Sequence, residues 1–192
     1  MATQFSDRQL HVGSLYGLRA FVVSGSGWLC GVNYHYPWQP GENVAECHRG
    51  STSEYWRRVM SDLVRAGAAE WIPPDHGQTE VPHELVALDC TCGYYAYYDG
   101  SNDHLSQVGW TLRPESGPRV AGIIEGYGRV VAGTRGFRAE KARLRAVVLP
   151  GVARHHSGAK AVLRNYPDLP AFRTADLALA EFPLTDYSEV PA

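Results

Sequence analysis

Four residues have the types and spacing of a metal site, and three of them are cysteines. Cys90 and Cys92 lie two positions apart, so their side chains point the same way in an extended chain. Cys47 would supply a third thiolate, and Cys₃His sets are common structural zinc sites. Three histidines could complete the set: His48, His76 and His83. The spacing predicts zinc binding, with reduced structural thiols or a redox role as the alternative interpretations. Cys30, inside an apolar run, is expected in the core.

Motifs of nucleophilic and nucleotide-dependent catalysis are missing from the sequence. It contains no Gly-x-Ser-x-Gly, no phosphate-binding Gly-x-x-x-x-Gly-Lys and no His-Glu-x-x-His. Glu125 and Glu140 are the only acids in a long basic stretch. They are either general acid/base carboxylates or partners of local arginines. An enzyme is therefore the less favoured interpretation.

Charge is distributed unevenly along the chain. Residues 119–165 contain ten Lys or Arg against two Glu, a balance of +8. Because the net charge of the chain is −2, the remaining residues carry a balance of −10. One interpretation is a basic layer that faces acidic loops; the other is a patch for phosphate or an acidic partner. Exposed aromatic and basic residues favour binding surfaces. The partner-binding candidates are Tyr95, Tyr97, Arg135, Arg138, Lys141 and Arg143.

Hydrophobic periodicity predicts the elements that position these residues. Leu15–Val23 and Trp28–Val32 are expected to pair as a hairpin around a glycine-rich turn. Within the basic stretch, strands are expected at 120–125, 129–132 and 144–149. Residues 138–143 are expected to form a short helical turn or a bent strand.

The sequence also predicts helices. Ser51–Trp71 has apolar residues at intervals of three and four, which indicates one long amphipathic helix. Short helices are expected at 159–165 and 174–181, the second capped by Thr174.

These elements predict an α+β fold. We expect a twisted antiparallel sheet or partly closed small β-barrel, with the long helix of about 51–71 on one side and short C-terminal helices over an edge. The expected organisation is a core domain over 1–150 and a helical extension over 151–192 that packs on it. No apolar run is long enough to cross a membrane, and the amino terminus lacks a secretory signal, so a cytoplasmic location is expected.

Four stretches resemble a family of small uncharacterised proteins from actinobacteria and their phages, mycobacteriophages especially. They are GLRAFVV from Gly17, PWQPGENVAEC from Pro37, CTCGYYAY from Cys90 and IEGYGRVVAGTRGFRAEKARLRAVV from Ile124. The resemblance covers about half of the chain. It implies a metal set of Cys47, His83, Cys90 and Cys92, and an actinobacterial or phage context without an established activity.

The sequence therefore favours a non-enzymatic interaction protein, phage-encoded and acting on a host actinobacterial protein or another phage component. Nucleic-acid binding through the basic stretch is the first alternative, although the sequence pI of 6.4 argues against it. A metal or carboxylate enzyme is the second.

Overall fold

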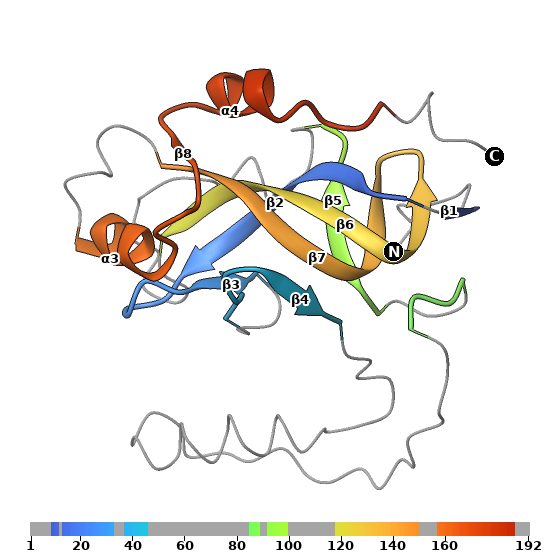
Figure 1. Cartoon of the computed structure of the whole chain (residues 1–192), viewed down its shortest axis with the longest axis horizontal. Helices are drawn as coiled ribbons and strands as arrows, with labels where there is room; N and C mark the ends of the chain where they lie inside the picture. Colours follow the sequence, from blue (N-terminus) through green and yellow to red (C-terminus); the bar gives the residue numbers. More distant parts are fainter. Residues whose placement is uncertain are drawn as a thin grey trace, which may run out of the picture.

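A long β-hairpin over residues 119–148 forms the centre of the fold (Figure 1). The computed structural model of the chain describes residues 9–11, 13–32, 37–45, 85–88, 92–99, 118–149 and 157–186. In chain order the described elements are β1 (Gln9–His11), β2 (Leu15–Val23), β3 (Leu29–Gly31), β4 (Glu42–Val44), β5 (Tyr94–Tyr97), β6 (Arg119–Gly133), β7 (Gly136–Val148), α3 (Ser157–Asn165), β8 (Ala171–Phe172) and α4 (Ala175–Glu181).

The central hairpin is strongly twisted because each of its strands has one extra residue at a β-bulge. A two-residue turn joins β6 to β7, with Gly133 opposite Gly136. The register shifts twice along the pair, between Ile123 and Ile124 and again between Tyr127 and Val130. Such β-bulges increase the twist and bend the strand. Gly128 lies in the second bulge with φ +77°, which favours glycine.

Both edges of the hairpin are covered by shorter strands from distant parts of the chain. Along β6 the outer edge pairs with β2 and then β1, both antiparallel. Along β7 it pairs with β5 at residues 136–139, with β4 at 141–143 and with β8, in parallel, at 147–148. Because β2 also pairs with β5, at Leu18 and Tyr97, the strands β2, β6, β7 and β5 close into a ring.

Small residues make this narrow ring possible. A β-carbon on Gly17 of β2 would lie 2.7 Å from Ala96 of β5 and 2.8 Å from the ring of Phe137 on β7. A β-carbon on Gly126 of β6 would overlap the same ring and lie 2.8 Å from Ala139. Phe137 and both alanines are fully buried. One aromatic ring therefore fills the interior that glycine and alanine leave open.

The C-terminal segment shares the core of the barrel. Tyr166, which follows α3, is buried in this core. Its hydroxyl donates to the Trp38 carbonyl at 2.7 Å and accepts from the Leu29 amide at 3.1 Å. Ala178 of α4 is buried in a second apolar cluster on the other side of the sheet, with Leu18 and Ile123. Residues 157–182 thus close the two faces of the sheet.

The predicted α+β class is wrong. The described residues form mostly antiparallel strands, with two short helices, α3 and α4, and no long amphipathic helix among them. The helix predicted at 51–71 lies outside the described residues. Residues 138–143 are regular strand within β7, because partner strands on both edges override their helix-forming side chains.

Several local predictions are confirmed. The strand at Leu15–Val23 has the predicted bounds, and it pairs with β3 as a hairpin. Helices occupy 157–165 and 175–181, and the Thr174 hydroxyl accepts from the Leu177 amide as the N-cap of the second. None of the described helices is long and apolar enough to span a membrane.

Candidate interaction surface

Of the four predicted metal ligands, Cys92 lies in the described part of the chain. Cys47, His83 and Cys90 lie outside it. The Cys92 sulfur accepts the backbone amide of Val86 at 3.1 Å. The described residues contain no group of three His, Cys, Asp or Glu that could hold a metal. The zinc site therefore stays a prediction. Cys30 is confirmed as a core residue, and burial raises the pKa of its thiol to about 11.

Arg138 holds the loop beside Cys92 in place. Its guanidinium donates to the Cys92 carbonyl at 3.0 Å and to the Ala87 carbonyl at 2.5 Å. Val86, next to Ala87 in the chain, is fully buried with φ +59°, a conformation that costs a β-branched residue about 1–2 kcal/mol. Such backbone persists where several contacts determine it together. Arg138 is only 2% exposed, so this candidate supports the loop and offers no surface to a partner.

Two other predicted residues, Lys141 and Arg143, lie on the outer face of β7 in a compact charged array. Directly paired residues share a face of a sheet. Arg143 is flanked by Glu42 on β4 and Glu125 on β6, and Lys141 by Val44 and Tyr127 on the same two strands. Val44 is 50% exposed, one of the few large apolar side chains so open among the described residues.

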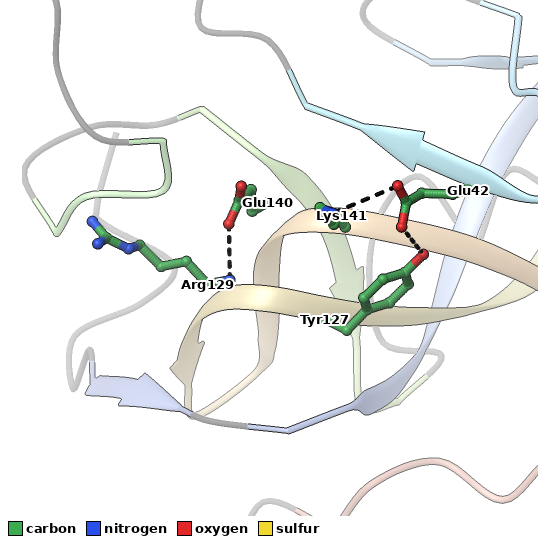
Figure 2. A network of polar contacts seen from close by, with 5 residues as sticks. All are labelled: Glu42, Tyr127, Arg129, Glu140 and Lys141. Atoms are coloured by element: carbon green, nitrogen blue, oxygen red, sulfur yellow. Dashed lines mark hydrogen bonds and ion pairs between the residues drawn. The ribbon is translucent and has the colours of Figure 1, made fainter.

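The Glu42 side chain contacts Tyr127 and Lys141 and lies on the strand position paired with Arg143. We call these four residues the Glu42 cluster: Glu42, Tyr127, Lys141 and Arg143. Figure 2 shows its carboxylate between two strands: Oε2 accepts from the Tyr127 hydroxyl at 2.8 Å, and Oε1 lies 3.5 Å from the Lys141 ammonium. The Arg143 guanidinium lies over the Tyr127 ring, 5.5 Å from its centroid. The phenol and the ammonium therefore contact one carboxylate, and the guanidinium beside the phenol ring adds a second positive charge.

The electrostatics of the Glu42 cluster suit binding better than proton transfer. The hydrogen bond from Tyr127 lowers the pKa of Glu42, and the charges of Lys141 and Arg143 add to this effect. Burial raises the pKa of Tyr127, and the hydrogen bond to Glu42 raises it further. A general acid or base works best with a pKa near the operating pH. Both shifts here move away from neutrality, so the carboxylate stays charged and the phenol stays a donor.

The remaining predicted residues lie at the hairpin tip, away from the Glu42 cluster. Arg135 is exposed in the turn, and its carbonyl accepts from the Tyr98 amide at 3.1 Å. Tyr95 and Tyr97 are half-buried on β5. The Tyr95 carbonyl accepts from the Arg19 guanidinium at 2.6 Å. The tyrosine-rich strand thus borders an internal cation rather than forming one open aromatic face.

That internal cation, Arg19, has aromatic rather than acidic neighbours in the described structure. Its guanidinium lies 5.2 Å from the centroid of the Trp38 ring and 5.8 Å from that of Phe21. Burial lowers its pKa to about 10, opposed by the nearby tyrosines, so the group stays charged at neutral pH. Cation–π contacts of this kind stabilise a desolvated guanidinium.

The two acids of the basic stretch have local partners. The Glu140 carboxylate accepts the backbone amide of Arg129 at 3.1 Å inside the β6 bulge (Figure 2). Glu125 lies 3.8 Å from the Arg145 guanidinium. Glu125 is therefore a partner of a local arginine, which was one of the two interpretations of the sequence. Glu140 instead supports the backbone of the bulge. Acidic residues lie among the basic ones, which interrupts a continuous basic stripe.

The sequence reasoning missed Glu42, Val44 and Tyr127. Polar and apolar residues alternate at 141–144, and this signal could have placed Lys141, Arg143 and their β6 neighbours on one face. Glu42 and Val44 belong to a three-residue strand in a segment with the composition of a loop, so local sequence carried no signal for them. No family model, curated protein or solved structure matches the chain.

Proposed function

We propose that this protein is a non-enzymatic interaction protein that binds another protein through the outer face of β4, β7 and β6. Following the resemblance, we propose a phage-encoded protein that acts in the cytoplasm on a host actinobacterial protein. The binding surface consists of Val44 and the Glu42 cluster.

The carrying observation is the combination of an exposed aliphatic side chain with tyrosine and arginine on a rigid sheet. Val44 and Lys141 are direct neighbours across two paired strands, and Tyr127 flanks Lys141 on the other side. Arginine and tyrosine are enriched at protein interfaces and among their energetic hot spots. The strand β7 is paired on both sides at these positions, with β4 and β6, and this holds the groups in place and reduces the entropy lost on binding.

Nucleic-acid binding and catalysis have less support. Phosphate binding needs clustered cations, but Glu42 and Glu125 lie among the cations of β7, and Arg138 is buried. For catalysis, the pKa directions of Glu42 and Tyr127 are opposite to those that an acid/base pair needs at neutral pH.

The test is to identify a partner and measure its affinity for surface variants. Proteins captured from an actinobacterial lysate are identified, and the best candidate is purified and titrated against the wild type and against Val44→Ser and Tyr127→Ala. We expect each substitution to weaken binding about ten-fold, or about 1.4 kcal/mol, which is more than most interface side chains contribute.

Leu177→Ser is the matched control, because Leu177 is 55% exposed on α4, outside the proposed surface. Its affinity should equal that of the wild type. A purified partner that binds all three variants as tightly as the wild type would contradict the proposed surface.

A further inference from the structure

Glu42 occupies its cluster as a bound ligand would. Its two carboxylate oxygens contact different donors, the Tyr127 hydroxyl at 2.8 Å and the Lys141 ammonium at 3.5 Å. The register of β4 on β7 places Arg143 directly opposite Glu42. Charged and neutral donors around a carboxylate are the usual means of recognising this group in proteins.

The contacts of Glu42 are easily exchanged for equivalent ones. Its side chain is 43% exposed and that of Lys141 is 36% exposed. Exposed ion pairs contribute little to stability, because water solvates both groups well after separation. A carboxylate from outside could therefore replace that of Glu42 at small cost.

The backbone under Glu42 stays in place during such an exchange. The next residue, Asn43, is buried, and its side chain accepts from the Gln39 amide at 2.8 Å. It also donates to the carbonyls of Gln39 and Gly41 at 3.1 and 3.2 Å. Because these bonds hold β4, rotation of the Glu42 side chain into water is enough to vacate the donors.

We propose that Tyr127, Lys141 and Arg143 form a carboxylate-binding site, which Glu42 fills in the unbound protein and an acidic side chain of the partner protein takes over. This inference rests on the proposed function and adds the chemistry of the partner: an acidic segment. The Arg143 guanidinium, stacked on the Tyr127 ring, is the second charged donor for the incoming group.

The experiment titrates a fluorescent poly-glutamate peptide into the full chain at low salt. Glu42→Gln removes the resident carboxylate and should tighten binding about two- to five-fold, the size of an exposed ion pair. Arg143→Ala should weaken binding, both in the wild type and in the Glu42→Gln background. Raising the salt should weaken all of these complexes.

Two controls change the same charge elsewhere. Glu181→Gln removes an exposed acid on α4, and Arg164→Ala removes an exposed cation on α3. Melting temperatures verify that every variant is folded. If Glu42→Gln tightens binding no more than Glu181→Gln, or if Arg143→Ala loses no more affinity than Arg164→Ala, the carboxylate site is wrong. Binding of inorganic phosphate by a protein that does not bind the peptide would also overturn it.

The outcome separates this inference from the proposed function. If the peptide fails but the purified partner still depends on Val44 and Tyr127, the interaction surface stands and only the carboxylate exchange falls. If the peptide shows the expected pattern but the partner ignores Val44, the carboxylate site stands and the proposed protein interface falls.

Discussion

The ring of Phe137 lies against the backbone of Gly126, so closely that a β-carbon on the glycine would overlap it. The two residues belong to the paired strands β7 and β6. Because Phe137 also lies close to Gly17 on β2, it fills the ring of strands from several sides. The barrel that carries the Glu42 cluster on its outer face therefore depends on the match between one large and several small interior residues.

We predict strong coupling between Gly126 and Phe137. Gly126→Ala should lower the free energy of unfolding by about 1–3 kcal/mol because the interior has no room for a methyl group. In a Phe137→Leu background, the same substitution should cost less, since the smaller side chain leaves space. Urea unfolding of the four proteins in this double-mutant cycle measures the coupling. Additive free energies would show that the two side chains do not share this space.

Arg138 should contribute to stability, although it is charged. Arg138→Met leaves the half-buried Cys92 and Ala87 carbonyls without their donor, at about 0.5–1.5 kcal/mol for each lost hydrogen bond. Arg135→Met, at the exposed turn, should change stability by no more than about 0.5 kcal/mol. Denaturant unfolding compares them. Equal losses for the two substitutions would argue against the supporting role of Arg138.

The β6 bulge should depend on Gly128. An alanine there must adopt φ +77°, at about 1–2 kcal/mol, and its β-carbon would lie 3.1 Å from the Glu140 carboxylate. Gly25→Ala is the control, since a β-carbon at Gly25 meets nothing within 4 Å. Thermal unfolding should show a clear loss for Gly128→Ala and little change for Gly25→Ala. A Gly128→Ala protein as stable as the wild type would exclude this bulge geometry.

Stability should fall at alkaline pH, partly through Tyr166. Burial raises the pKa of Tyr166 from 10.0 to about 12. The folded state therefore holds its phenolic proton where the unfolded state has lost it, and this stabilisation disappears as the pH rises through this window. Tyr166→Phe should lower stability by about 1–3 kcal/mol at neutral pH, because two buried hydrogen bonds are lost.

Unfolding measured across the alkaline range tests the titration of Tyr166. Between pH 10 and 12, the free energy of unfolding should fall less steeply with pH for Tyr166→Phe than for the wild type. The remaining pH dependence comes from other groups such as Cys30, whose pKa is also raised. Identical slopes would mean that Tyr166 does not titrate differently in the folded and unfolded states.

The predicted zinc site is tested by elemental analysis of protein purified without a histidine tag. About one zinc per chain is expected, and Cys92→Ser should lose it because a hydroxyl is a poor zinc ligand. Cys30→Ala is the control, since Cys30 is buried in the core, and should retain the metal. Wild-type protein without zinc would return Cys92 to a purely structural role as the acceptor of the Val86 amide.

The sequence by itself determined the local elements whose pattern is complete within a short segment. Leu15–Val23 contains a full run of strand-forming residues, and Thr174 stands where a helix N-cap is needed. These signals involve neighbours in the chain, so they are present before the chain folds. They identified β2, the apolar parts of β6 and β7, and both described helices.

Only the tertiary structure decided the barrel and the Glu42 cluster. The strands β4 and β5 exist because β7 offers them a free edge, and their own sequences are short. The bond between Glu42 and Tyr127 joins residues 85 positions apart. Such contacts depend on which strands pair and in which register, and a shift by one residue would turn each side chain to the opposite face. Pairing is settled by burial across the whole chain, and therefore no local pattern contains it.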